Sequence, residues 1–135
     1  MGNKSAPILA LFFALASCAP PQRAVTPLTQ EAKEYVQHLK LSDVEMKATE
    51  TYLKQTLTEI EGNIQNQGNR PLKTVELMCV FYDAYGQVAI RERVRIVRST
   101  LKPGETKAFR LAFDDIPDGW NHQMPSLVIA AIVFD

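Results

Sequence analysis

The side chains that could perform catalysis are few and widely separated along the chain. The two histidines, His38 and His122, lie outside the H-x-x-x-H and H-E-x-x-H spacings that bind zinc. Asp114 and Asp115 are neighbours at an expected strand end, where successive side chains point to opposite faces, so we expect a turn cap there. Asp83 precedes a turn and favours the same role. No G-x-S-x-G, G-x-G-x-x-G or Walker motif occurs, so we expect no catalytic residue, metal or cofactor.

The two cysteines point to different chemistry. Cys79 alternates with apolar residues such as Leu77 and Phe81, which indicates a small buried side chain in a strand. Cys18 follows an apolar segment close to the N-terminus. If the Cys18 thiol carries another group, Cys79 has no partner, so we expect no disulfide and a hydrophobic core must hold the fold together.

The segment before Cys18 has the layout of an export signal. Residues 7–16 are apolar throughout, and Lys4 is the only charged residue before Cys18. This apolar run is much shorter than the roughly 20 residues that a membrane-spanning helix needs. Leu15-Ala16-Ser17-Cys18 then resembles the lipobox of bacterial lipoproteins. The resemblance implies removal of residues 1–17 and attachment of a diacylglycerol to the Cys18 thiol. Two alternatives remain: ordinary cleavage at a small-x-small site, or an uncleaved anchor.

Residues 18–27 contain three prolines and predict an extended tether. At about 3.1 Å per residue, ten residues would hold a domain roughly 30 Å from the lipid. The lipoprotein resemblance implies a periplasm-facing position in the bacterial cell envelope. Ala19 replaces the Asp that retains enteric lipoproteins in the inner membrane, which favours the outer membrane. The chain has 15 basic and 15 acidic residues, a balance that argues against nucleic acid as the main partner.

The remaining residues, 28–135, predict one domain that begins with a short helix. Ala32, Val36 and Leu39 recur at helical spacing, and Thr26-Pro27 would cap the helix, which we place at residues 28–38. Residues 39–50 alternate between apolar and polar, with a one-residue slip at Ser42-Asp43. This pattern indicates a strand with a bulge.

Five further strands are expected, at residues 55–65, 73–83, 87–98, 107–114 and 126–134. Gly- and Pro-containing turns separate them, at residues 66–71, 84–87 and 101–106, and a longer loop spans residues 114–121. In the strand at 107–114, alternation places Phe109, Leu111 and Phe113 on the inner face. Five or six short strands at this spacing predict an all-β fold, an immunoglobulin-like antiparallel β-sandwich.

Three motifs in order support this architecture: residues 62–68 (GNIQNQG), 75–87 (VELMCVFYDAYGQ) and 101–109 (LKPGETKAF). They resemble the FxLYD-type immunoglobulin-like domains of bacterial envelope proteins over about residues 55–116. The resemblance implies the fold and an extracytoplasmic setting. It implies no catalytic residues.

Two features could form a binding surface. Arg91, Arg93 and Arg95 share one face of a strand, spaced roughly 7 Å apart, and could grip phosphates or carboxylates of an envelope polymer. Alternatively, they form ion pairs with Glu59 and Glu61 if those two strands are neighbours.

Trp120 is the other candidate. It lies in a loop between strands, where it could anchor a partner or fold back to close the open end of the sandwich.

The strands at 73–83 and 126–134 are apolar on both faces, although a sandwich buries only one face of each sheet. Either the short helix or another protein must cover the second face. We therefore expect a non-catalytic envelope lipoprotein that acts as a protein-interaction or assembly module, bound to the membrane through lipid on Cys18. The alternative is a binder of small ligands or glycans that uses the arginine face and Trp120. A hydrolase is the most remote option.

Overall fold

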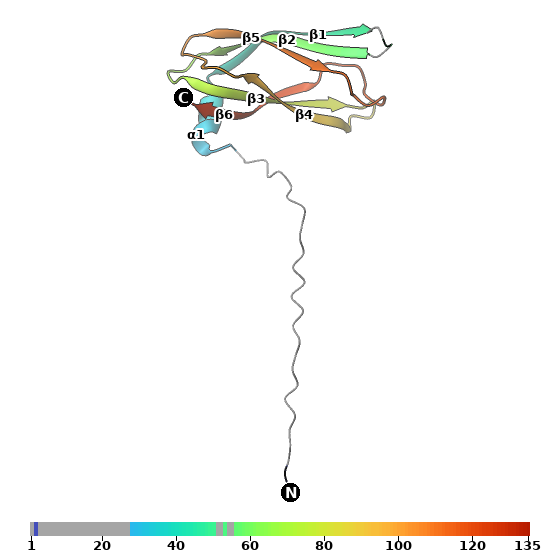
Figure 1. The fold of residues 1–135 in the computed structure, drawn as a ribbon, viewed down its shortest axis with the longest axis horizontal. Coiled ribbons are helices and arrows are strands. Elements are labelled where there is room, and N and C mark those ends of the chain that lie inside the picture. The colour runs from blue at the N-terminus through green and yellow to red at the C-terminus, as the bar shows by residue number, and fades with distance from the viewer. Residues whose placement is uncertain (1, 3–27, 51–52, 54–55) are drawn as a thin grey trace.

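The computed structural model describes residues 2, 28–50, 53 and 56–135. The expected signal peptide (1–17), the lipidation site Cys18 and the tether (18–27) therefore lie outside the described residues, apart from Gly2. The described chain contains one helix and six strands (Figure 1). No helix in this part of the chain is both long and apolar enough to cross a bilayer.

The six strands form two three-stranded sheets packed as a β-sandwich, which confirms the expected all-β class. One sheet, sheet A, has the order β1-β2-β5, with β1 at Leu39–Glu50, β2 at Thr56–Asn66 and β5 at Thr106–Phe113. The other, sheet B, has the order β4-β3-β6, with β4 at Val88–Val97, β3 at Leu72–Tyr82 and β6 at Ser126–Phe134. All neighbouring strands are antiparallel.

The expected bulge in β1 is present. The register between β1 and β2 shifts between Ser42 and Glu45, and Asp43 has a left-handed backbone with φ 52°. Its carboxylate accepts a hydrogen bond from the Asn63 side chain on β2, at 3.3 Å. Asp is among the residues that tolerate this conformation best, so the slip in the sequence pattern marks a real irregularity.

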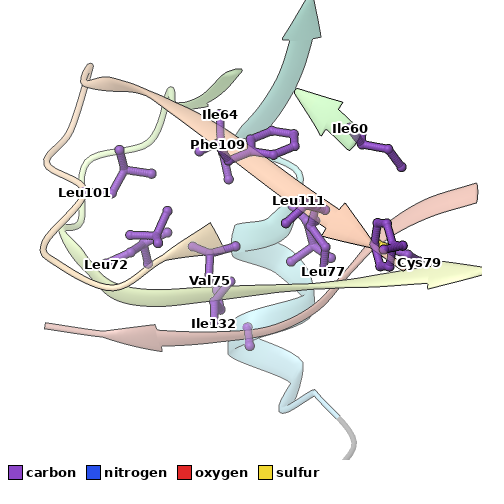
Figure 2. Packing of buried hydrophobic residues seen from close by; sticks show 14 of the residues in the cluster. Ile60, Ile64, Leu72, Val75, Leu77, Cys79, Leu101, Phe109, Leu111 and Ile132 are labelled. Carbon is purple, nitrogen blue, oxygen red and sulfur yellow. The ribbon is translucent and has the colours of Figure 1, made fainter. Parts of the chain in front are cut away.

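The core lies between the two sheets and follows the period-2 alternation of the strands (Figure 2). Phe109, Leu111 and Phe113 of β5 are buried, as expected. Phe113 meets Phe81 of β3 edge to face, with 5.0 Å between ring centroids. Aromatic pairs of this kind stabilise a core beyond the area they bury.

Helix α1 (Gln30–Val36) is shorter than expected, and Thr29 rather than Thr26 caps it. The Thr29 hydroxyl accepts a hydrogen bond from the Ala32 N–H at 3.1 Å, which satisfies one of the free donors at the helix start. Tyr35 anchors the helix, because its ring packs edge to face on Phe134 of β6, 5.2 Å away. The helix therefore covers only the last part of β6.

Asn66 was expected in a polar turn, but it is the last residue of β2 and is completely buried. Its side-chain oxygen accepts hydrogen bonds from the Tyr35 hydroxyl (2.8 Å) and the Gly68 N–H (3.1 Å). Its amide nitrogen donates to the carbonyls of Arg70 (2.8 Å) and Leu101 (3.2 Å). One side chain thus joins α1, the β2–β3 loop and the β4–β5 loop.

The connections divide the sandwich into two ends (Figure 1). The helix end carries α1, the loops at 67–71 and 98–105, and the last residue, Asp135. The loop end carries the β3–β4 turn at 83–87, the β5–β6 loop at 114–125 and the β1–β2 connection, of which the structure describes Leu53. Because the chain enters the domain through α1, its N-terminal segment joins at the helix end.

Candidate functional site

The arginine row lies on the outer face of sheet B, along β4. Arg93 Nε lies 2.6 Å from one carboxylate oxygen of Glu76, and Arg95 Nη2 lies 3.3 Å from the other. Register explains the contact, because Glu76 on β3 is directly opposite Arg95. Among the described ion pairs none involves Arg91, which is exposed.

The expected pairing of these arginines with Glu59 and Glu61 is wrong. Strands β2 and β4 belong to different sheets, so the two rows of charges lie on opposite outer faces. Glu59 pairs with Arg110 of β5, and Glu61 lies 3.8 Å from both Arg110 Nε and Lys47 Nζ. The outer face of sheet A is thus a solvated, ion-paired surface.

Arg93 and Arg95 change the pKa of the Glu76 carboxylate. Partial burial alone would raise its pKa, but hydrogen bonds and charge from Arg93 and Arg95 outweigh that effect and lower the pKa. Glu76 therefore stays ionised at neutral pH and neutralises part of the row. The positive charge left on this face is centred on Arg91.

The outer face of sheet B also exposes apolar side chains. Val128 and Val133 of β6 are 55% and 49% exposed, and Met78 of β3 is half-buried beside Val128. Helix α1 was one candidate cover for this face, but its ring contact with β6 is at Phe134. The apolar outer face of β6 therefore remains largely open to solvent.

Trp120 closes the loop end of the sandwich. Its side chain is 6% exposed and packs edge to face on Phe81, with 5.6 Å between ring centroids. Its backbone forms an isolated antiparallel β-bridge with Asp83. Within the described residues its indole N–H has no hydrogen-bond acceptor. A cavity of about 170 Å³ adjoins it, lined by Thr56, Thr58, Ile116, Pro117, Asp118 and His122. The ring thus serves as a plug, with this cavity beside it.

The remaining candidates are placed as follows. His38 is exposed and contacts the Tyr35 ring, while His122 is exposed with a left-handed φ of 61° and stacks near Trp120. Asp83 accepts hydrogen bonds from two backbone N–H groups of the turn it precedes, at 2.9 and 2.8 Å, which confirms its expected role.

Asp114 and Asp115 are both exposed. Cys79 is fully buried, and burial, with a smaller contribution from Glu92, raises the pKa of its thiol to about 11. In the described part of the chain no group of three or more His, Cys, Asp or Glu side chains could hold a metal ion.

The sequence did not single out Tyr85, the most exposed aromatic residue in the described part of the chain. Tyr85, at the tip of the β3–β4 turn, is 90% exposed, and Met124 in the β5–β6 loop is 42% exposed. The sequence does indicate this exposure, because Tyr85 is the central residue of an Ala-Tyr-Gly turn and such a turn projects away from the core. Both residues belong to the loop end.

Comparisons of the chain with protein-family models, with curated proteins and with solved structures found no match.

Proposed function

We propose that this protein is a non-catalytic lipoprotein of the bacterial cell envelope, anchored through lipid on Cys18, whose sandwich acts as a protein-interaction or assembly module. The Leu15–Cys18 segment supports the anchor, because two or three acyl chains hold a protein firmly where one would not. The sandwich itself is compatible with many functions, so the argument depends on its surface.

The observation that carries the interaction role is apolar exposure on an otherwise charged surface. Tyr85, Val128 and Val133 are each about half or more exposed, whereas the outer face of sheet A is covered by ion pairs. Exposed tyrosine is a frequent anchor of protein interfaces. A solvated scaffold alone would not need these side chains.

The motif residues have structural roles, which leaves other positions for binding. Asn66 and Gly68 hold α1 and the β2–β3 loop, while Leu101 and Phe109 fill the core. Gly104 has a left-handed φ of 78°, as its turn requires. Function is therefore expected at exposed positions without such a structural role, Tyr85 in the 75–87 motif among them.

The test is cross-linking in intact cells of a tagged full-length protein beside a Cys18→Ser variant, with mass spectrometry of the products. We expect fatty acylation of Cys18, membrane fractionation and a discrete protein partner, with the variant losing all three. A membrane-bound Cys18→Ser protein would refute the lipid anchor. The absence of a partner for either form would refute the interaction role.

Small-ligand binding is a second candidate, favoured by the cavity beside Trp120. Its lining offers Thr56, Thr58 and Asp118 for hydrogen bonds, and the buried indole N–H is an unused donor. Titration with soluble mono- and disaccharides should then change Trp120 fluorescence in a saturable way, and Thr56→Val should weaken the change. An unchanged spectrum at millimolar sugar would remove this candidate.

A further inference from the structure

The two ends of the sandwich differ in charge. The loops of the helix end contain Arg70, Arg98 and Lys102 against one acidic residue, Glu105. Two of the three connections at the loop end, the β3–β4 turn and the β5–β6 loop, contain four aspartates (Asp83, Asp114, Asp115 and Asp118) and neither lysine nor arginine. The third, residues 51–55, contains Lys54 and lies outside the described residues apart from Leu53. With α1 (Glu31, Lys33, Glu34) and Asp135 included, the helix end carries four basic and four acidic side chains, so the loop end is the more acidic of the two. The two ends lie at opposite sides of the sandwich (Figure 1).

Exposed apolar side chains gather at the same acidic end. Tyr85 lies in the β3–β4 turn and Met124 in the β5–β6 loop, and Val88 follows at the start of β4. They are 90%, 42% and 42% exposed. Asp114, Asp115 and Asp118 are exposed in the same loop as Met124. The loop end therefore combines apolar contact groups with a rim of negative charge.

We infer that the loop end is the docking surface of this module, and that its partner is a protein with an apolar socket edged by lysine or arginine. This inference rests on the proposed interaction role. Interfaces commonly place aromatic anchors at the centre and complementary charge around them. The aspartate rim disfavours an anionic lipid surface and the same end of a second copy, because like charges repel.

The scaffold holds this surface in a fixed shape. The Asp83 carboxylate accepts hydrogen bonds from the Tyr85 and Gln87 N–H groups, which fixes the turn below the exposed ring. The Trp120 ring packs on Phe81, and the Trp120 backbone forms a β-bridge with Asp83. These contacts hold the β5–β6 loop against the β3–β4 turn. A surface fixed in this way loses little conformational freedom on binding.

Site-specific photo-cross-linking of the full chain in its native cells tests the inference. A photoreactive phenylalanine analogue replaces Tyr85 or Met124 at the loop end, and Lys102 or Arg98 as exposed controls at the helix end. We expect one protein product at the first two positions and none at the controls, with lysine or arginine in the cross-linked peptide of the partner. A homodimer, a lipid adduct or equal yields at both ends would overturn the inference.

Charge reversal provides the second criterion. Asp114→Lys with Asp115→Lys should reduce the product about tenfold or more, because close interfacial charge pairs contribute more than 1.4 kcal/mol. The matched control, Glu34→Lys with Glu45→Lys, reverses two exposed charges outside the loop end and should leave the yield unchanged. Equal loss in both double variants, or in neither, would contradict the inference.

The two proposals can fail separately. A product confined to the helix-end positions would refute docking at the loop end but keep the interaction role. The absence of any product at all four positions, with the protein in the membrane fraction, would refute both. Tyr85→Ala adds a check that needs no charge change: it should lower the yield at position 124 while urea unfolding stays unchanged, since the side chain is 90% exposed.

Discussion

At the scale of single residues, the Asn66 side chain connects parts of the fold that lie far apart in the sequence. Its amide makes four hydrogen bonds to three separate parts of the chain, and none of it is exposed. A buried polar group is stabilising only when its hydrogen bonds are all made. Asn66 meets that condition and fixes α1 against the helix end.

Replacing Asn66 with Ala should therefore lower the free energy of unfolding by about 1–3 kcal/mol, because the buried site loses the four hydrogen bonds of its side chain. The Tyr35 hydroxyl and the Leu101 carbonyl each keep a second partner, which limits the loss. Urea unfolding measures the change. Asn63→Ala is the control, since its side-chain hydrogen bond to Asp43 is exposed and should contribute well under 1 kcal/mol. Equal losses in the two variants would contradict the role assigned to Asn66.

Cys79 predicts a pH dependence. Burial raises the pKa of its thiol to about 11, so the thiol is neutral in the folded protein while the unfolded chain ionises near pH 9. The stabilisation that comes from keeping this thiol neutral should be fully present below pH 9. The free energy of unfolding should then fall as the pH rises from 9 toward 11, because the unfolded chain loses the proton first.

Unfolding measured from pH 8 to 11 should show this decline, and Cys79→Ala should flatten that part of the curve. An identical slope in both proteins would assign the decline to other groups. Native Cys79 should also resist alkylation at pH 8, because the thiolate is the reactive form.

At the scale of elements, the close approach of β2 and β5 depends on Gly62. A Cβ atom there would lie 2.7 Å from Phe109 Cζ and 3.1 Å from Val44 Cγ2. Gly62→Ala should therefore destabilise the fold by about 1–3 kcal/mol through overpacking, measured by thermal unfolding. Gly119→Ala is the matched control, because nothing lies within 4 Å of the added atom. A neutral Gly62→Ala would show that Phe109 can move freely.

The strands themselves follow from sequence because alternation is a local signal. Residues 126–134 form a strand with the predicted bounds, and the slip at Ser42-Asp43 is a bulge. Sheet partners depend on how strands distribute between two layers, which no local pattern encodes. That is why the pairing of Glu59 with the arginine row was wrong.

The burial of Asn66 could have been found from the same alternation. Ile60, Gly62 and Ile64 occupy the inner face of β2, and Asn66 is the next residue of that face. Turn chemistry at residues 66–71 concealed this, because Asn and Gly together usually indicate an exposed loop. The loop end could not be predicted as a surface from the sequence, because its turn and loop come together only in the folded chain.

At the scale of the whole molecule, the charge difference between the ends gives the domain an orientation. If Cys18 carries lipid, the helix end, through which the chain enters the domain, is the end nearer the membrane. The acidic loop end is repelled by an anionic surface and then faces away from the lipid.

Amine labelling of the full chain in vesicles measures this orientation. Lys33 and Lys102 at the helix end should react more slowly on anionic than on zwitterionic vesicles, while Lys47 on the outer face of sheet A should react equally on both. High salt should abolish the difference by screening. Uniform reactivity of all three lysines would contradict a preferred orientation.

Strand β6 has a consequence for how this chain behaves at high concentration. It is an edge of sheet B, and Ser126–Phe134 contains no charged residue, whereas the other edge strands β1, β4 and β5 all do. An uncharged edge is a template for aggregation, and α1 shields only its last part, through Tyr35 and Phe134. Deleting residues 28–36 should therefore produce fibrous aggregates that bind thioflavin, and Ala131→Lys in the same deletion should suppress them.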